Sequence, residues 1–169
     1  DLPIQFADFA EWQRQCLQGE LLETQLTYWK QQLAGAPLLM ELPFDNLRPA
    51  VQTYAGARQS LVLPATLSEA IKTLSRTEGH TLFVVLLAAF KALLSRYTNQ
   101  TDIVIGSPVA GRNHVETESL IGFFVNMLVM RADLSGSSRF RDLLRQRFGV
   151  PVALEMDANA AALGEYWKG

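Results

Sequence analysis

A long apolar run near the middle of the chain limits the possible folds most. The segment TLFVVLLAAFKALLSRYTN, residues 81–99, is apolar on almost every side between Leu82 and Leu94 when it is read at helical spacing. A helix of this kind is stable only when most of its circumference is buried. The pattern therefore predicts a helix at the centre of the core, covered by the rest of the chain.

Helical patterns and short strand patterns alternate along the rest of the chain. Strands are predicted by the alternating residues 58–63, by the β-branched run that starts at residue 102, and by the apolar run 127–132. The segment 41–57 carries two prolines and a glycine without any period, which predicts a long loop. Further helices are expected to begin near Asp8, Glu20, Thr66, Val115 and Ser138, with Thr66 and Glu69 at capping-box spacing. This alternation indicates an α/β fold.

Composition narrows the possible partners. The 169 residues are 49% hydrophobic, which suffices for one globular domain or for one lobe of a larger domain. The formal net charge is -2, so we expect no nucleic acid and no anionic membrane as a partner. The single cysteine, Cys16, excludes an internal disulfide. The run Leu82–Phe90 is too short to span a bilayer, and no signal peptide opens the sequence. We therefore expect a cytoplasmic protein.

The two histidines do not indicate a metal or catalytic site by themselves. Neither His80 nor His114 has another histidine or a cysteine at ligand spacing, so no metal site is expected. Either imidazole can act as a general base only if the fold brings a nucleophile and an orienting carboxylate to it. The turn GSPVAG, residues 106–111, lacks the Gly-Lys-Ser/Thr ending of a phosphate-binding loop. Nucleotide binding is therefore not supported in this segment.

The segment IGFFVNMLVMR, residues 121–131, places Asn126 inside an apolar run and ends the run with Arg131. From the residues alone, Asn126 is interpreted as an amide that hydrogen-bonds loop backbone where a helix ends. Arg131 is interpreted as an arginine that reaches water from a strand end. These interpretations follow from the tendency of boundary residues to satisfy backbone groups.

The same segment closely resembles the IGxFVNTxxxR motif of condensation domains in nonribosomal peptide synthetases, with methionine at the position of the threonine. Four other segments resemble motifs of that family in the same order along the chain. They are FADFAEWQR at residues 6–14, YWKQQLAGAP at 28–37, LPFDNLRPA at 42–50, and the long segment 80–112. Ordered matches over about 145 residues are much more specific than any one motif.

The resemblance implies a chloramphenicol-acetyltransferase-like lobe, in which a mixed sheet is flanked by helices. It implies that residues 1–57 form interlobe helices with a crossing loop. It also implies that residues 58–147 form part of the second lobe of a condensation domain. A tunnel between two lobes would receive phosphopantetheine arms from carrier proteins that bear aminoacyl or peptidyl groups. Site residues implied by the family motifs are Ser107 and Arg112 beside the arm, and Gly122, Asn126 and Arg131 in the framework near the tunnel.

The family's catalytic motif, HHxxxDG, has no counterpart in this chain, which contains no adjacent histidines. In the family that motif precedes the position of residues 6–14. A proton-transfer group typically contributes roughly 10²–10⁴-fold to a rate, so we expect this chain alone to be inactive and assign no catalytic residue to it. No cofactor is expected to bind it directly. The first lobe is the expected partner, and apolar surface meant for that lobe predicts self-association.

The last residues, 148–169, resemble a different family. VPVALEMDANAAALGE is similar to the PVxxENDANAAALGE segment of ROK-family sugar kinases. That resemblance implies Asp157 at the position of the kinase base. The residues themselves also suit an alanine-rich helix capped by Asp157. The change of resemblance near residue 147 indicates a recombined sequence, natural or engineered. The alternative function is therefore that of a recombined or engineered α/β scaffold or interaction module, and a sugar kinase remnant ranks after it.

Overall fold

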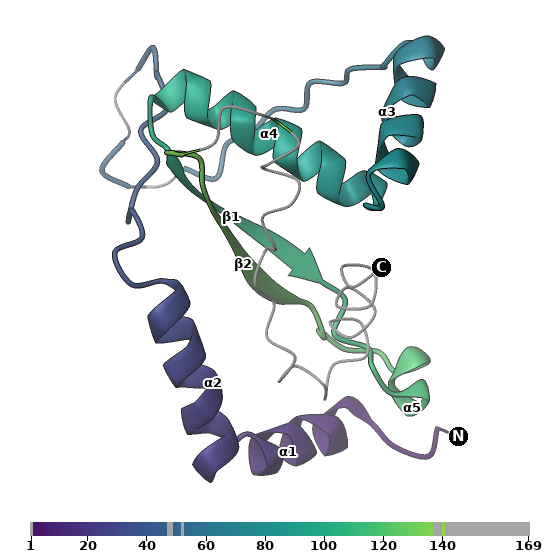
Figure 1. Ribbon diagram of the computed structural model, residues 1–169. Coiled ribbons are helices and arrows are strands. Elements are labelled where there is room, and N and C mark those ends of the chain that lie inside the picture. The colour runs from purple at the N-terminus through teal and green to yellow at the C-terminus, as the bar shows by residue number, and fades with distance from the viewer. Residues whose placement is uncertain (1, 47–48, 52, 137–139, 141–169) are drawn as a thin grey trace.

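The computed structural model describes residues 2–46, 49–51, 53–136 and 140. Four helices, α1 (Phe6–Cys16), α2 (Gly19–Gln32), α3 (Ala65–Thr77) and α4 (Leu82–Thr98), precede strand β1 (Asp102–Val109). A short helix, α5 (Val115–Glu118), and strand β2 (Asn126–Asp133) follow. Figure 1 shows α4 beside one end of the β1–β2 pair, and α1 and α5 near the other end. The helix expected after Ser138 and the kinase-like segment 148–169 lie outside the described residues.

The two strands form an antiparallel sheet in which Asp102 lies opposite Asp133 and Val109 opposite Asn126. Along β2, burial alternates: Leu128, Met130 and Ala132 are buried while their neighbours are less so. Alternation arises because successive side chains of a strand point to opposite faces. The strand predicted at residues 127–132 is thus confirmed, with one face in the core.

Helix α4 packs its buried residues against that face of the sheet. Val84, Val85, Leu87 and Ala88 form one cluster with Val109 and the buried side chains of β2. The Thr81 hydroxyl caps the start of the helix by accepting a hydrogen bond from the Val84 amide at 3.3 Å. Asn99, in the left-handed conformation, ends it. The predicted helix is confirmed.

The prediction that α4 is buried on most of its circumference is wrong for the described chain. Its outer side is exposed at regularly spaced residues, which we call the outer stripe: Phe83, Leu86, Phe90, Leu93 and Tyr97, with exposed fractions of 43%, 44%, 49%, 49% and 62%. Among the described residues, only one side of the helix therefore has a core to pack against.

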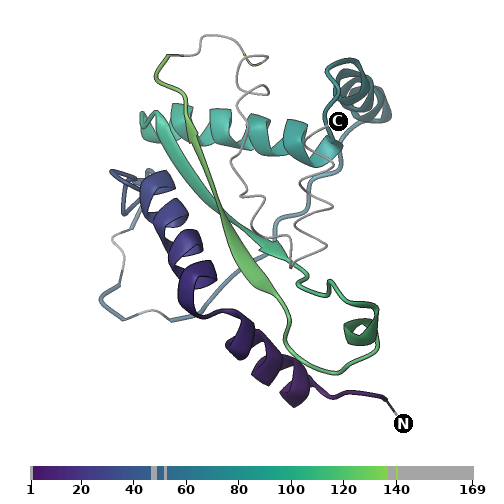
Figure 2. The same ribbon diagram turned by 60° about the horizontal axis from the view of Figure 1, so that its bottom comes forward.

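A second, smaller core joins distant parts of the sequence. Phe9 on α1, Leu120 and Phe124 form it, with Ile4 and Phe6 packed beside them. Phe124 lies 5.0 Å from Phe6 and 4.9 Å from Phe9, measured between ring centroids. Figure 2 shows α1 and α5 together near the end of the strands that lies away from α4. This cluster attaches the N-terminal helix to the loop that precedes β2.

Three other predictions differ from the structure. Residues 58–63 form no strand and are exposed throughout, because no described strand pairs with them and an extended segment needs a ladder partner. The helix expected over residues 115–124 stops at Glu118. Helix α3 begins after Pro64 without a side-chain cap, so the predicted capping box at Thr66 is wrong. Proline suits the first turn of a helix because no intrahelical bond needs its missing N–H.

Candidate functional site

Arg131 is the most extensively bonded side chain of the predicted site residues. Its Nε donates to Asp102 Oδ1 at 3.0 Å, and its Nη2 donates to Asp102 Oδ2 at 2.7 Å. Its Nη1 donates to the carbonyl oxygens of Gln32 at 2.8 Å and Ala34 at 2.9 Å. The hydrogen bond with Asp102 raises the pKa of the Arg131 guanidinium above its ordinary value. Arg131 therefore does not simply reach into water.

These bonds join three elements that are distant in sequence. Asp102 opens β1, Arg131 lies near the end of β2, and Gln32 is the last residue of α2. The last carbonyls of a helix have no intrahelical donor, and a cation there also complements the helix dipole. The planar guanidinium can donate hydrogen bonds to the carboxylate and to both carbonyls at the same time. Arg131 thus fixes α2 against the sheet.

Replacing Arg131 should lower the melting temperature of the chain. We expect Arg131→Ala to lower it by several degrees, because Asp102 and the two carbonyls lose their common donor. Arg131→Lys should recover only part of the loss, because an ammonium lacks the fork geometry of a guanidinium. Thermal unfolding followed by circular dichroism measures the effect, with Arg58→Ala in the exposed segment 58–63 as the control. Equal melting temperatures for all these variants would contradict this role.

Arg112 organises the loop between the strands. Its guanidinium carbon lies 4.1 Å from the centroid of the Phe124 ring. Its Nη1 donates to the carbonyl oxygens of Thr117 and Glu118, and its Nη2 contacts the Gly122 carbonyl oxygen at 3.5 Å. Arginine pairs well with aromatic faces and with several acceptors at once. Arg112 therefore ties α5 and the residues after it to the aromatic cluster.

Glycines allow this loop to approach its neighbours closely. A Cβ on Gly122 would lie 2.4 Å from Phe6 Cδ2, so the IGFFVN motif packs directly on α1. A Cβ on Gly111 would lie 2.1 Å from the Phe124 carbonyl oxygen and 3.6 Å from Asn126 Nδ2. Asn126 is the first residue of β2 and is exposed. The loop thus requires glycine at both positions for steric reasons.

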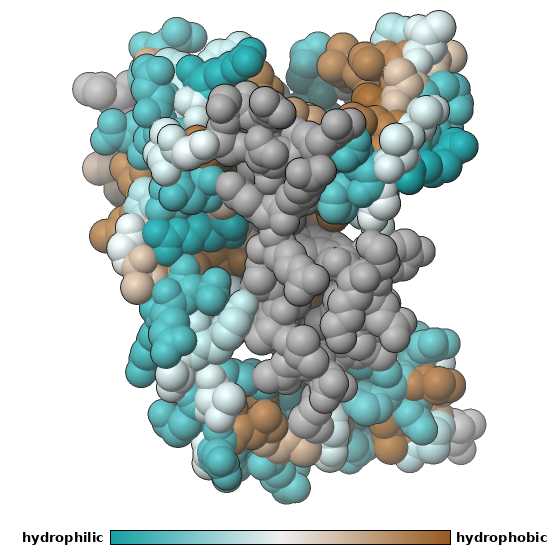
Figure 3. Space-filling view, viewed as in Figure 1, coloured by the Kyte–Doolittle hydropathy of each residue, from teal (hydrophilic) through white to brown (hydrophobic). Residues whose placement is uncertain are grey.

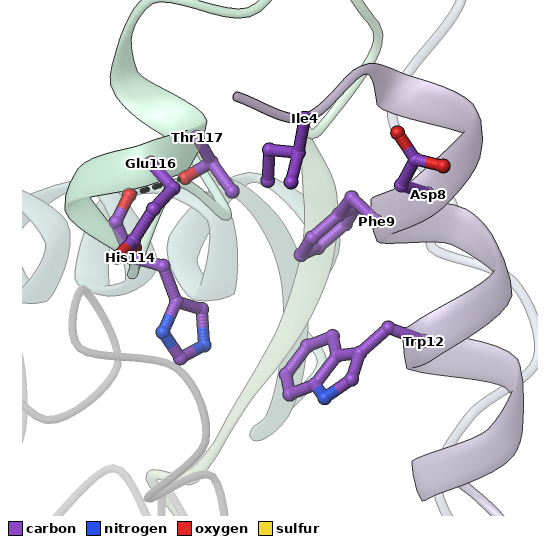
Figure 4. A pocket seen from close by; sticks show the side chains of 7 residues that line it. All are labelled: Ile4, Asp8, Phe9, Trp12, His114, Glu116 and Thr117. Atoms are coloured by element: carbon purple, nitrogen blue, oxygen red, sulfur yellow. Dashed lines mark hydrogen bonds between the residues drawn. The ribbon is translucent and has the colours of Figure 1, made fainter. Parts of the chain in front are cut away.

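A pocket with a volume of about 400 Å³ lies between α1 and the loop that carries α5. Its lining residues are Ile4, Asp8, Phe9, Trp12, His114, Glu116 and Thr117, drawn in Figure 4. The His114 and Trp12 rings meet edge to face with centroids 5.1 Å apart. The Asp8 carboxylate accepts a hydrogen bond from the Gln5 amide at 2.8 Å. Asp8 therefore caps α1 and does not orient the imidazole.

The histidines have no catalytic arrangement among the described residues. His114 Nε2 is buried and has no hydrogen-bond partner there. The His80 carbonyl accepts a hydrogen bond from the Ser75 hydroxyl at 2.6 Å, which leaves that hydroxyl committed to the backbone. No group of three or more His, Cys, Asp or Glu residues in the described chain is placed to hold a metal ion. In the described residues, the side chains of this site therefore hold backbone segments in position.

The predicted site residues do not all gather in one place. Arg112 and Gly122 are in contact, and Asn126 lies beside Gly111. Ser107 is in β1 opposite Leu128 and is half-buried. Arg131 is at the other end of β2 from Asn126, about 17 Å away at the usual rise of a strand. Asp157 lies outside the described residues. The family motif therefore serves two separate junctions, one at each end of the strands.

Two charged residues near Arg131 were missed by the sequence analysis. Asp102 is its ion-pair partner, and Lys91 on α4 is a fully buried side chain. Burial lowers the pKa of Lys91 to about 7, and the nearby Asp102 charge opposes that shift. An acidic residue at the first position of a predicted strand was the only signal for Asp102. A lysine at a core-facing position of the apolar helix was the signal for Lys91.

Comparisons with known proteins identify the family of the chain. A model of the condensation-domain family matches residues 1–148. The chain is 62% identical over 144 residues to one of the linear gramicidin synthase proteins of Brevibacillus parabrevis, covering 85% of this chain and 2% of the relative. It is 48% identical over 145 residues to phosphinothricin tripeptide synthetase PhsC of Streptomyces viridochromogenes, covering 86% of this chain and 13% of the relative. The chain therefore spans a small part of these relatives.

The fold also matches solved structures. The X-domain from teicoplanin biosynthesis superimposes with a TM-score of 0.81 and 28% identity, covering 99% of this chain and 36% of that one. The helices and the antiparallel strands described above are thus part of a larger α/β, chloramphenicol-acetyltransferase-like fold. The motifs occur in the order that the family has, and the family model matches most of the chain. The chain therefore belongs to the condensation domains of nonribosomal peptide synthetases.

Proposed function

We propose that this chain is a section of a domain that forms peptide bonds between aminoacyl or peptidyl groups on carrier proteins. The observation that carries the proposal is the condensation-domain match over residues 1–148, together with relatives that are named as a gramicidin synthase and a tripeptide synthetase. Carrier proteins would present these groups on phosphopantetheine arms, and the amine of one group would attack the thioester of the other. The proposal places this reaction in the cytoplasm.

Within that domain the described residues would build the framework. The contacts of Arg131 with Asp102 and α2 support this role at one end of the strands. The contacts of Arg112 support it at the other end. We also propose that Ser107 and Arg112 lie beside the path of the arm. Since the Arg112 guanidinium already serves loop carbonyls, it would act there by holding the loop in place.

This chain alone should not catalyse condensation. Its histidines, His80 and His114, are separated in sequence, and the nearby hydroxyls of Ser75 and Thr117 donate to the backbone carbonyls of His80 and His114. Removal of a proton-transfer group typically lowers a rate by roughly 10²–10⁴-fold. We therefore assign the chemistry to residues of the complete domain that precede this section.

An assay with two loaded carrier proteins tests the proposal. A complete condensation domain that includes these residues should convert donor and acceptor aminoacyl carriers into a dipeptidyl carrier, detected by mass spectrometry. The isolated chain at the same concentration should give product at least about 10²-fold more slowly. A complete domain that forms no peptide with any loaded carrier pair would contradict the proposed function. Peptide formation by the isolated chain at the full rate would contradict its predicted inactivity.

The likeness of residues 148–169 to a sugar kinase stays a prediction. Its central residue, Asp157, lies outside the described residues. A melting temperature that glucose does not change would count against any remnant of sugar binding. Self-association also stays a prediction, and sedimentation at high protein concentration tests it.

A further inference from the structure

The pocket between α1 and the loop that carries α5 combines apolar walls with charged groups. The rings of Phe9 and Trp12 and the side chain of Ile4 form its apolar part. Figure 4 shows both rings projecting from α1 toward the side that carries His114. The volume of the pocket is about 400 Å³, and small-molecule sites usually have volumes of roughly 300–1,000 Å³. The pocket is therefore large enough for a small organic ligand.

The charges around the pocket have one sign. Asp8 and Glu116 are the carboxylates of its lining, which contains no lysine or arginine. Arg112, on the same loop, lies outside the lining, and its guanidinium faces the Phe124 ring and donates to backbone carbonyls. Glu116 forms no ion pair with any described residue. Carboxylates beside aromatic rings attract a positively charged ligand, because the faces of the rings are also negative.

One side of the pocket also holds a buried hydrogen-bonding atom. His114 Nε2 has no hydrogen-bond partner among the described residues. The residue itself is held in place, because its carbonyl oxygen accepts from the Thr117 hydroxyl at 2.6 Å and its ring meets the Trp12 ring edge to face. A buried polar atom without a partner costs free energy, which a ligand in the pocket can recover. A neutral imidazole can accept a hydrogen bond from an ammonium group through its unprotonated nitrogen.

Apolar side chains are exposed elsewhere as well. The outer stripe of α4 is about half exposed, and Figure 3 shows a further gathering of apolar side chains beside α3. No single described helix is long and apolar enough to cross a membrane, and α3 with α4 passes that test only as a pair bent by 108°. The outer stripe carries no charged side chain with which to select a ligand, whereas the pocket carries two carboxylates. The pocket is therefore the stronger candidate for a small-molecule site.

We propose that this pocket binds a small organic cation, in which an ammonium group is carried on an aromatic or alkyl body. The body of the ligand lies against Phe9 and Trp12. The ammonium group lies near Glu116 and donates a hydrogen bond to His114 Nε2. The second carboxylate of the lining adds negative charge. This site is separate from the proposed peptide-bond chemistry and does not require it.

Two matched probes, 2-phenylethylamine and the neutral 2-phenylethanol, test the inference. They share a ring and nearly the same size, and they differ in charge. Each is titrated into this chain and into a complete condensation domain that carries these residues. Binding is followed by the NMR signal of the Trp12 indole N–H, which is identified by its loss in Trp12→Phe. The amine should shift this signal with a Kd of about 1 mM or tighter. The alcohol should bind at least about fivefold more weakly.

Glu116→Gln and Glu118→Gln separate binding in the pocket from a general attraction of amines to an acidic surface. Both substitutions remove one negative charge from α5, and only Glu116 lines the pocket. Glu116→Gln should raise the Kd of the amine about two- to fivefold. Glu118→Gln should change it by less than about 1.5-fold, because a more distant exposed charge is screened by salt. Neither substitution should change the Kd of the alcohol.

Several results would overturn the inference. Equal affinities for the amine and the alcohol would show that the pocket does not select a cation. Equal effects of the two glutamine substitutions, or an unchanged Trp12 signal in both proteins, would show that the amine does not bind in this pocket. A shift in the isolated chain that is absent from the complete domain would show that the rest of the domain fills the pocket. A complete domain that binds the amine here yet forms no peptide would contradict the proposed function and leave this inference standing.

Discussion

Gly111→Ala should destabilise the chain by about 2–5 kcal/mol, because it combines two separate costs. The first is conformational: Gly111 has a φ of 65°, where residues with a Cβ are strained. The second is steric: the new Cβ would lie 2.1 Å from the Phe124 carbonyl oxygen, a backbone atom that cannot rotate away. Relief of that clash must move the loop that Arg112 holds. Urea unfolding followed by circular dichroism measures the loss.

Gly79→Ala is the matched control for this prediction. Gly79 has a φ of 68°, and a Cβ there meets no atom within 4 Å. It should therefore show the conformational cost alone, about 1–2 kcal/mol. The difference between the losses of unfolding free energy in the two variants measures the steric cost of the close approach of Gly111 to Phe124. Equal losses at both positions would contradict the close approach.

Lys91→Met should stabilise the chain at pH 7. The Lys91 side chain is fully buried, and burial lowers its pKa to about 7 from an ordinary value of 10.5. Between these two values the unfolded chain holds a proton that the folded chain has released. The free energy of unfolding therefore rises with pH across this window, by up to about 1.4 kcal/mol per pH unit. Below pH 7 the penalty of burying the ammonium is present in full.

The measurement is the difference in the free energy of unfolding between the wild type and Lys91→Met as a function of pH. Urea unfolding of the wild type and of Lys91→Met at pH 6 to 10 should show the variant more stable at pH 6–7. Its advantage should shrink as the pH rises toward 10.5. Lys72→Met, on the exposed side of α3, should change the stability at pH 7 by no more than about 0.5 kcal/mol. A Lys91→Met variant that is less stable than the wild type at pH 7 would contradict this account of the buried lysine.

Periodicity predicted much of the fold, because local spacing decides which segments become helices. The apolar helix 82–98 and the strand near residues 127–132 formed as expected. The sequence predictions failed where a segment needs another segment to pack or pair against, because local spacing does not say whether that other segment is present. The alternating pattern of 58–63 is compatible with a strand, but a strand forms only beside another strand. The outer side of α4 has the composition of a buried surface, while the described chain offers nothing to bury it.

The candidate site was only partly predictable for a related reason. The family motif singled out Gly122 and Arg131, and the structure places Gly122 in close packing on α1 and Arg131 in an ion pair. The partner Asp102 lies 29 residues from Arg131 in sequence, and no local pattern joins two such positions. The carbonyl acceptors on α2 are backbone groups, which leave no trace in residue identity. Contacts of this kind are set by the tertiary fold and not by any local sequence pattern.

We propose that the IGFFVNMLVMR motif builds the framework of the domain and does not perform its chemistry. Arg131→Lys in a complete condensation domain tests it most directly, when the melting temperature and the rate of peptide formation per folded molecule are measured together. We predict a lower melting temperature and a rate that falls far less than the roughly 10²–10⁴-fold typical of a lost proton-transfer group. A rate lower by about 10²-fold or more at an unchanged melting temperature would show that Arg131 takes part in the reaction.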